Sequence, residues 1–564
     1  MSGIDNEGST PSPTNTLVTA LLTDMYQISM TYAHWKNDRA DDESVFELFF
    51  RRNPFGGEYT IFAGLDECLK FMAHFKFTQS DVDYLKTIPS MKGCDDAFFD
   101  WLLQVDTSKV KVYAMRDGSV AFPRMPLLMV QGPLGIAQLL ETTLLTLVNY
   151  PSLIATNASR MVLAATERRE VSESLPAQCR QTPVCVEFGL RRAQGPDGGF
   201  SASKYAAMGG FVATSNVQAG KLLGLNVAGT HAHAFVQTYT GLEEVKGRTV
   251  TDNTEQGTGE NVEILPKVLE YRHKLATDNP NFGTTNDGEL AAFIAYAVAF
   301  PHNFLCLVDT YETLTSGLLN FVVVTLVLDD LGYVPKGIRL DSGDLAYLSL
   351  ECAKCFASFA EKRPYFHNLS IVASNDINED VLHALNKQDH AITVYGIGTN
   401  LVTCQAQPAL GCVYKLVEVE GRPRMKLSQE IEKVLIPGRK KPYRLVGRDG
   451  RPIMDLLTGY DESEPQTNVR ILCRHAFIER KRAAVTPSRV EALHVLVFDH
   501  GKVVPDANRN LDQARVAAAE ELQRLRPDVR RYFNPTPYKI AVTDSLFHFL
   551  HELWQSETPV PELS

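Results

Sequence analysis

The sequence predicts an α/β protein whose centre is a (β/α) barrel or a close relative of one. Three observations carry this prediction. Short apolar runs typical of buried strands alternate with helical patterns from residue 184 onward, and polar side chains follow several of these runs. The 564 residues also exceed one ordinary domain, so at least two folded units are expected. Because ligands bind at the carboxyl ends of parallel strands, the polar residues should gather on one face.

The segment from residue 337 to about residue 363 is the clearest strand-turn-helix unit. A predicted strand at 337–340 contains one cation, Arg339, and ends in Asp341-Ser342-Gly343-Asp344. The helical pattern begins at Leu345, with Asp344 or Ser342 as its N-cap. An arginine at a strand end suits an anionic substrate, because its planar fork donates in pairs to phosphate or carboxylate. The alternative is a structural salt bridge between Arg339 and Asp341.

Five more predicted strands end in polar or glycine-rich sequences and form the rest of the barrel. They are 304–308 before Asp309-Thr-Tyr311, 369–374 before Asn375-Asp376, 392–395 before Gly396-Ile-Gly398-Thr399, 225–229 before Thr230-His-Ala-His233, and 184–187 before Phe188-Gly-Leu-Arg-Arg192. Further helices are predicted at about 201–208, 317–331 and 378–386.

The sequence on either side of the barrel predicts further units. We expect a disordered tail at 1–15, an N-terminal α+β domain at 16–185, the barrel at 186–430 with an insertion at 241–287, and a peripheral C-terminal region at 431–564. The predicted elements there are a helix at 21–35 capped by Thr23 or Asp24, a strand at 45–50, a β-rich module at 109–131, a surface loop at 167–181, one helix at 264–275, paired strands at 411–417 and 424–427, and a charged helix at 510–526.

Composition and charge exclude several classes of protein. With 44% hydrophobic and 22% charged residues the chain is typical of globular proteins, and a net charge of -11 argues against generic nucleic-acid binding. The first fifteen residues lack the features of a signal peptide, and the longest apolar run, 318–328, is too short to span a membrane. Ten cysteines, with Cys352 and Cys355 inside a predicted helix, favour core packing over a zinc or redox site. We therefore expect a cytoplasmic protein.

Three residues in the N-terminal part are ambiguous when taken singly. Tyr26, in the first turn of a predicted helix, suits either plain packing or a ring presented to a planar ligand. Arg51 and Arg52 precede a glycine-rich turn, where they could hold a phosphate or lie in a solvated turn. The residues alone favour the solvated turn.

Two histidines, His231 and His233, flank Ala232 directly after a predicted strand. A metal pair is the weaker interpretation, because no third ligand or HExxH spacing accompanies them. If the backbone stays extended, the two rings point to opposite sides, so only one of them can face the pocket. A lone catalytic imidazole with a structural neighbour is therefore favoured.

Six motifs occur together and in the same order as in a known enzyme family. They are Leu22-Thr-Asp-Met-Tyr26, Glu47-Leu-Phe-Phe-Arg-Arg52, Gly189-Leu-Arg-Arg-Ala-Gln-Gly195, Gly229-Thr-His-Ala-His233, Arg339-Leu-Asp-Ser-Gly-Asp344 and Gly396-Ile-Gly-Thr399. With them the chain resembles the eukaryotic type of nicotinate phosphoribosyltransferase, in the type II phosphoribosyltransferase family. The resemblance covers about residues 17–460, and it departs in a longer stretch at 167–185 and in the insertion at 241–287.

The resemblance implies an ATP-assisted transfer. Nicotinate attacks C1 of 5-phosphoribosyl 1-diphosphate and gives nicotinate mononucleotide and pyrophosphate, which is a step toward NAD from the free acid. The implied fold is an incomplete α/β barrel joined to an N-terminal α+β domain, and the implied assembly is a homodimer whose active sites are shared between subunits. Nucleic acid and membranes are not expected partners.

The resemblance also assigns roles to residues of this sequence. His233 resembles the histidine that ATP phosphorylates. Breaking the ribosyl C1–O bond builds oxocarbenium charge, which Asp341 or Asp309 could stabilise, or these carboxylates could hold Mg²⁺ against the diphosphate. The implied nicotinate contacts are Tyr26, Phe188, Thr230 and Arg339, and the implied phosphoribosyl contacts are Arg191, Asn375, Gly396, Gly398 and Thr399, with Arg51 and Arg52 reaching the phosphate in a partner subunit.

Three other interpretations compete with this one. The nicotinamide-using relative of the same fold places an acidic side chain where this chain has Thr214-Ser215-Asn216, and an acid there would repel the carboxylate of nicotinate. A non-catalytic nucleotide-binding or scaffold protein of barrel fold has no need of His233, Arg339 and Asp341 together. The bacterial quinolinate enzyme is a much shorter chain. Nicotinate is therefore the expected substrate.

Overall fold

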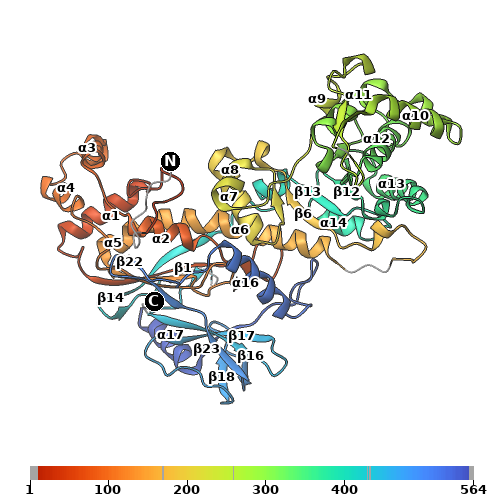
Figure 1. Cartoon of the computed structure of the whole chain (residues 1–564). Helices are drawn as coiled ribbons and strands as arrows, with labels where there is room; N and C mark the ends of the chain where they lie inside the picture. The colour runs from red at the N-terminus through yellow and green to blue at the C-terminus, as the bar shows by residue number, and fades with distance from the viewer. Residues whose placement is uncertain (1–9, 168–170, 258, 428–429, 431–432, 558–564) are drawn as a thin grey trace, which may run out of the picture. The chain divides into compact units, whose positions relative to one another are not determined.

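The chain divides into two compact units in a computed structural model that describes residues 10–167, 171–257, 259–427, 430 and 433–557 (Figure 1). The divisions fall between Asn157 and Ala158 and between Gln405 and Ala406. The segments before the first division and after the second form one unit, and the segment between them forms the other. The domain limits predicted at 185/186 and 430/431 differ from these positions.

The second unit is built on a six-stranded parallel sheet. Its strand order is β10-β11-β12-β13-β6-β7, and each strand is parallel to its neighbours. The open parallel sheet, with helices between its strands, confirms the predicted incomplete (β/α) barrel. The strands are β6 (Val184–Glu187), β7 (Ala213–Thr214), β10 (Leu305–Leu307), β11 (Gly337–Leu340), β12 (Ser370–Ala373) and β13 (Val394–Ile397).

Helices follow the strands of this sheet, and capping side chains start four of them, α8, α11, α13 and α14. The Asp344 carboxylate accepts a hydrogen bond from Tyr347 N at 3.0 Å and starts α13, which confirms one of the two predicted caps. Asn378 caps α14 in the same way, through Val381 N at 2.9 Å. The helices are α7 (Gly195–Met208), α8 (Val217–Leu223), α9 (His233–Val236), α10 (Ile264–Ala276), α11 (Asp287–Ala299), α12 (Leu318–Asp330), α13 (Leu345–Ala360), α14 (Glu379–Leu385) and α15 (Thr399–Thr403), while α6 (Glu141–Ala165) runs across the division of the chain.

One helical stretch among the described residues, Thr313–Asp330, is long and apolar enough to cross a membrane by length and composition. However, 72% of this stretch is buried inside the protein, as in the core helix of a globular fold.

One strand prediction in the second unit is wrong, and another strand is shifted by two residues. The segment 225–229 is largely exposed and pairs only through a lone bridge between Val227 and Thr214, because β7 takes the place beside β6. The strand predicted at 392–395 runs instead from Val394 to Ile397, so that Gly396 lies within the strand opposite Val186. The apolar pattern predicts that a strand is present here, whereas the bounds and register of β13 depend on its pairing with β6, which is distant in sequence.

The insertion at 241–287 is more regular than predicted. The expected helix is present as α10, but a short hairpin of β8 (Thr249–Thr251) and β9 (Asn261–Glu263) precedes it. Each strand has three residues and polar or charged ends, so neither gives a recognisable strand pattern.

The first unit contains two larger sheets. One is antiparallel, with the order β15-β14-β1-β5-β3-β21-β22, and the other has the order β19-β18-β23-β17-β16-β20. The predicted strands at 45–50 and 411–417 and the β-rich module at 109–131 are confirmed, but the strand predicted at 424–427 lies instead at 422–423. The strands are β1 (Glu43–Phe50), β3 (Lys111–Ala114), β5 (Leu128–Pro133), β14 (Cys412–Val419), β15 (Arg422–Pro423), β16 (Lys440–Val446), β17 (Pro452–Gly459), β18 (Ile471–Arg474), β19 (Arg482–Val485), β20 (Arg489–Ala492), β21 (Val495–Asp499), β22 (Lys502–Val503) and β23 (Ile540–Thr543), with β2 (Thr60–Ile61) and β4 (Val120–Ala121) paired separately.

Seven α-helices lie wholly within the described residues of this unit. Asp24 occupies the N-cap position of α1 without capping it, because its carboxylate accepts a hydrogen bond from the Thr142 hydroxyl at 2.9 Å instead. The helices are α1 (Met25–Lys36), α2 (Leu65–Ala73), α3 (Gln79–Thr87), α4 (Asp96–Leu102), α5 (Leu134–Leu139), α16 (Leu511–Arg524) and α17 (Asp544–Glu557).

Buried ion pairs join the C-terminal region to the N-terminal strands of the same unit. Lys440 Nζ lies 3.0 Å from a carboxylate oxygen of Glu47 in β1, and both side chains are at most 3% exposed. Arg444 pairs with Asp455 and donates to the carbonyl of Val120 at 2.8 Å. Because removing one partner leaves an uncompensated buried charge, such pairs hold their segments firmly in register. Residues after 430 are thus more closely integrated than the predicted peripheral region implies.

Candidate active site

The carboxyl ends of β6, β11, β12 and β13 surround one cleft in the second unit, with a volume of about 1140 Å³. This is the face on which parallel α/β folds bind their ligands. Most of the predicted site residues lie on its wall, namely Phe188, Arg191, Thr230, Arg339, Asp341, Asn375, Gly396, Gly398 and Thr399.

Arg339 projects from β11 into this cleft, and only some of its N–H groups donate hydrogen bonds within the protein. Its Nη1 donates to the hydroxyl of Thr230 at 3.3 Å, while its Nε is buried without a partner. Burial lowers the pKa of Arg339 from its usual value, and the carboxylates of Asp341 and Asp309 act against that shift. No ion pair joins Arg339 to Asp341 in the described part of the chain, so the purely structural salt bridge is excluded. The guanidinium therefore remains available to an anionic ligand.

Two carboxylates, Asp309 and Asp341, form a connected network beside Arg339. Asp309 accepts hydrogen bonds from the backbone N–H of Asp341 at 2.9 Å and from the hydroxyl of Ser342, yet its second oxygen is buried without a partner. Asp341 accepts from the Ser374 hydroxyl at 2.6 Å through one oxygen, and its other oxygen lies 3.6 Å from His233 Nε2. The network fixes both carboxylates before any substrate binds.

His233 and His231 lie in different environments, but the predicted extended backbone is wrong, because His233 begins the helix α9. As a result His231 lines the cleft, whereas His233 lies behind the wall that Asp341 forms. His233 Nδ1 lies 3.1 Å from the Thr310 hydroxyl, and its Nε2 lies 3.6 Å from Asp341 Oδ2. His231 instead accepts a hydrogen bond from Leu307 N through Nε2 at 3.3 Å. Of the two histidines, His233 is therefore the one joined to the carboxylate network.

The ring of His231 is also packed among aromatic side chains. Its centroid lies 4.9 Å from that of Tyr296 and 5.4 Å from that of Phe235. Burial lowers the pKa of His231 to about 4, so the ring is neutral at pH 7. These contacts give His231 a packing role.

The cleft also has the cations Arg191 and Arg192 on its wall, although the chain is acidic as a whole. Arg192 Nη1 donates to the hydroxyl of Thr399 at 3.2 Å and lies 4.0 Å from the exposed carboxylate of Asp376. The positive charge of Arg191 helps to lower the pKa of Arg339, so the two cations are close enough to interact electrostatically. A phosphate group entering here would meet donors from three different strand ends.

Glycine at position 396 lets an aromatic ring form part of the wall. A Cβ at Gly396 would lie 2.5 Å from the ring of Phe188, so a larger residue would displace that ring. Below it, the buried carboxylate of Glu187 accepts hydrogen bonds from the backbone of Gly189 and from the hydroxyls of Ser203 and Thr214. This network fixes the backbone on both sides of Phe188, at Glu187 and Gly189.

Three predicted site residues belong to the first unit. Tyr26 is the second residue of α1, with 47% of its surface exposed. Arg51 and Arg52 follow directly after β1. Their assignment to nicotinate and to a phosphate remains a prediction.

Several residues that build the site give little signal in the sequence. Ser374 and Thr310 hold Asp341 and His233, and Arg192 holds Thr399. Serine and threonine at strand ends are common turn residues, so only their spatial partners reveal the role. Glu187 carried a weak signal, because a charged residue ends an otherwise apolar run.

A buried acid, Glu289 in α11, supports the carboxylate side of the cleft. It accepts hydrogen bonds from Ser316 at 2.6 Å and from Asn320 at 3.1 Å, and it is fully buried. Burial raises the pKa of Glu289 to about 7, and the charge of Asp309 adds to this shift. Because the folded-state pKa exceeds the unfolded one, this group lowers the free energy of unfolding increasingly as pH rises through 4.5 to 7.

Replacing Glu289 with glutamine should therefore stabilise the second unit at pH 8, on the order of 2–3 kcal/mol, and much less at pH 5. Glutamine resembles the protonated acid and can still accept from Ser316 and Asn320. Hydrogen exchange of peptides from α11 and α12 is measured at increasing urea concentration, and the midpoints of the variant and the wild type are compared at both pH values. Glu255→Gln, on an exposed side chain of the same unit, is the control. An equal gain at both pH values would contradict the prediction.

Comparison with known proteins gives one consistent family. Family models described as the nicotinate phosphoribosyltransferase N-terminal domain, family and C-terminal domain match residues 21–149, 184–446 and 439–550. The chain is 48% identical to nicotinate phosphoribosyltransferase 1 of Arabidopsis thaliana, over 98% of this chain and 96% of the relative. It is 41% identical to the Homo sapiens nicotinate phosphoribosyltransferase, over 96% and 97%. The crystal structure of human nicotinic acid phosphoribosyltransferase superimposes with a TM-score of 0.82 at 39% identity, covering 94% of this chain and all of that one.

Proposed function

This chain belongs to the nicotinate phosphoribosyltransferase family and is an enzyme of pyridine nucleotide biosynthesis, and we propose that the cleft of the second unit is its active site. The enzyme transfers the 5-phosphoribosyl group of 5-phosphoribosyl 1-diphosphate to nicotinate. The single observation that supports this site most strongly is the meeting of Arg339 and Asp341 in the cleft at the strand ends, with His233 Nε2 3.6 Å from Asp341 and with Arg191 and Arg192 also on the wall.

In the proposed reaction, the ring nitrogen of nicotinate forms a bond to C1 of the ribose. The C1–O bond to the diphosphate breaks, and its electron pair leaves with pyrophosphate. Positive charge develops on the ribose ring in between, and Asp341 is held in place to stabilise it. Because Ser374 already directs one of its oxygens, Asp341 needs less reorganisation as that charge develops.

Nicotinate is a flat ring with a carboxylate, and the proposed contacts match both features. Arg339 and Thr230, already joined at 3.3 Å, would receive the carboxylate, and the ring of Phe188 would lie against the pyridine. Tyr26 would contribute a second ring. At Thr214-Ser215-Asn216 the chain carries no acid, and Ser215 lines the cleft, so nothing in this tripeptide repels a carboxylate.

The 5-phosphoribosyl 1-diphosphate would lie across the basic wall. Its phosphates would meet Arg191, the amide of Asn375 and the turn from Gly396 to Thr399. Arg51 and Arg52 would supply further donors from a second subunit.

Magnesium suits the carboxylate side of the cleft. Mg²⁺ binds through one or two carboxylates together with substrate phosphates, and Asp309 has one buried oxygen without a partner beside Asp341. No group of three or more potential ligands from His, Cys, Asp and Glu occurs among the described residues, which fits an ion held jointly with the diphosphate. When bound, the ion would neutralise charge on the leaving pyrophosphate.

We further propose that ATP assists the transfer by phosphorylating His233. When Nδ1 carries the proton and donates it to the Thr310 hydroxyl, Nε2 keeps its lone pair and can attack the γ-phosphorus of ATP, with ADP leaving. The phosphorylated ring would add negative charge on the side of the cleft where Arg339 lies. A cytoplasmic location is proposed as well, which the ten free cysteines fit.

The assignment is tested by measuring pyrophosphate release with nicotinate and with nicotinamide, each with and without ATP. We expect release with nicotinate, faster with ATP, and little with nicotinamide. Faster release with nicotinamide would favour the nicotinamide-using relative, and no release with either would favour a non-catalytic protein.

A shared active site in a homodimer predicts complementation between two damaged chains. A chain with Arg51→Ala and Arg52→Ala keeps its own cleft, and a chain with His233→Ala keeps its arginines. In a mixed dimer one site then has both parts intact, so random mixing should recover up to about a quarter of the ATP-dependent rate. The measurement is that rate after subunit exchange.

The matched control replaces the first chain by one that carries all three changes. A mixture with this chain contains no intact cleft and should recover nothing. If the first mixture recovers nothing either, once exchange has been verified by mass, the shared site is wrong.

A further inference from the structure

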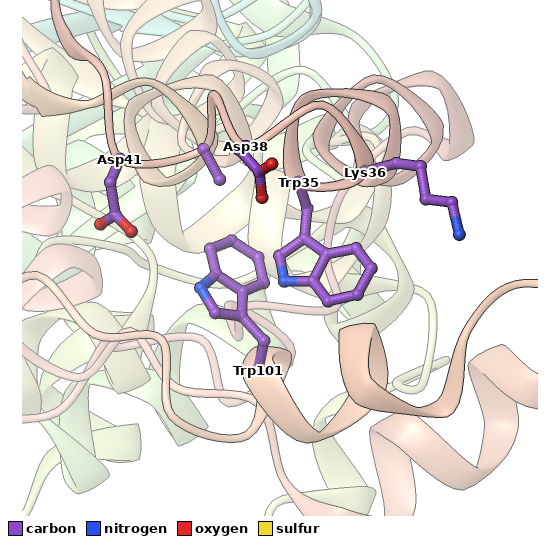
Figure 2. A pocket seen from close by; sticks show the side chains of 6 residues that line it. Trp35, Lys36, Asp38, Asp41 and Trp101 are labelled. Carbon is purple, nitrogen blue, oxygen red and sulfur yellow. The ribbon is translucent and has the colours of Figure 1, made fainter.

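A second concave site lies in the first unit and has no part in the proposed reaction. It has a volume of about 490 Å³ and is lined by Trp35, Lys36, Asp38, Ala40, Asp41 and Trp101 (Figure 2). Two of the three tryptophans of the chain thus meet at one pocket. Figure 2 shows their indoles beside each other, with the carboxylate of Asp38 next to them.

Both indoles are held in place from behind by a buried ring. Phe98 is fully buried, and its centroid lies 5.7 Å from that of Trp35 and 5.9 Å from that of Trp101. Gly135 lets Trp101 approach the backbone, because a Cβ there would lie 3.2 Å from the indole. The pocket is therefore preformed, and a ligand need not order its aromatic walls.

Acidic side chains lie at the same pocket. Asp38 has a left-handed backbone, with φ of 55°, and its N–H donates to the carbonyl of Trp35 at 3.1 Å. No hydrogen bond or ion pair reaches its carboxylate in the described part of the chain. Asp41 carries a second carboxylate, which lies 3.3 Å from Lys109 in an exposed pair that water screens. Aromatic faces and carboxylates together attract a cation.

The lysine at the pocket indicates which kind of cation fits. The ammonium of Lys36 lines the pocket but bonds to Asp95 at 2.6 Å, and the hydroxyl of Tyr32 donates to the same oxygen at 2.7 Å. A compact, strongly hydrated ammonium thus takes a carboxylate in preference to the indoles. A substituted ammonium group sheds its water more readily and presents methyl groups to the rings.

We propose that Trp35, Trp101 and Asp38 form a binding site for a substituted ammonium group, such as a quaternary ammonium. The indole faces contact the methyl groups, and the carboxylates of Asp38 and Asp41 balance the charge. This group can belong to a free small molecule or to a methylated lysine side chain, and the two sources share the same chemistry.

The test uses the full chain labelled with 5-fluorotryptophan, whose fluorine spectrum has three tryptophan signals. Trp35→Phe and Trp101→Phe assign two of them, and Trp554→Phe assigns the third if either of these variants fails to fold. Choline should shift the signals of Trp35 and Trp101 saturably and leave Trp554 unchanged. The neutral isostere 3,3-dimethylbutan-1-ol should bind roughly tenfold more weakly, because it lacks the charge.

Asp38→Asn should weaken choline about threefold and leave the neutral alcohol unaffected, whereas Asp83→Asn, on an exposed side chain outside the pocket, should change neither. Equal binding of choline and the alcohol would overturn the proposal, and so would shifts of all three signals or of none. An N-acetyl trimethyllysine amide identifies the source: tighter binding than choline supports a protein side chain, and weaker binding supports a free cation.

Discussion

Replacing Arg339 with lysine should lower kcat/KM for nicotinate by roughly ten- to a hundredfold, although the charge is kept. The reason is geometric. Arg339 donates to Thr230 through Nη1 and makes no other hydrogen bond in the described part of the chain, so its other guanidinium N–H groups are left for a carboxylate that enters the cleft. Lysine offers a single point charge and loses one charge-assisted hydrogen bond, worth about 1.5–3 kcal/mol. The measurement is steady-state kinetics with nicotinate varied at saturating 5-phosphoribosyl 1-diphosphate.

The matched control is Arg248→Lys, in the same unit but away from the cleft. Arg248 donates to the carbonyl of Val245 at 2.6 Å and contacts Glu263 at 3.9 Å, so it has a structural role only. This variant should keep the kinetics of the wild type. Unchanged kinetics in Arg339→Lys would show that the guanidinium does not hold the substrate.

The sequence alone predicts the parts of the site that are encoded locally. The run from Gly337 to Leu340 is buried on both faces, so its continuous apolar character reveals β11, and Asp344 then caps the next helix. Arg339 is also conspicuous in the sequence, because a buried cation inside an apolar strand needs a polar or charged partner. The residues on which chemistry depends are therefore the most visible ones.

What depends on distant partners could not be predicted. The pairing of β13 with β6 sets Gly396 opposite Val186, and no local pattern encodes that register. The segment at 225–229 has the composition of a strand but pairs only through a single bridge to Thr214, and its residues from Val227 to Gly229 line the cleft. The buried pair of Lys440 with Glu47 is likewise invisible, because a lysine in a charged segment normally faces water.

Replacing His233 with alanine should abolish the incorporation of label from γ-labelled ATP. His233 is the histidine joined to the cleft network, through Thr310 and Asp341, and its Nε2 is the proposed phosphoryl acceptor. A phosphohistidine is labile in acid and stable in base, so the label should show that behaviour in the wild type. The variant should retain some ATP-independent transfer, because ribosyl chemistry uses Arg339 and Asp341.

The decisive comparison is with His231, two residues earlier in the chain. His231→Ala should keep the label, since the ring packs against Tyr296 and accepts from Leu307 N instead of contacting Asp341. If alanine there disturbs folding, His231→Gln is the better variant, because its amide oxygen can still accept from Leu307 N. Label that survives in His233→Ala, or that disappears only when His231 is replaced, would reverse the assignment. Only the second result would place the phosphoryl acceptor on the aromatic side of the loop, at His231.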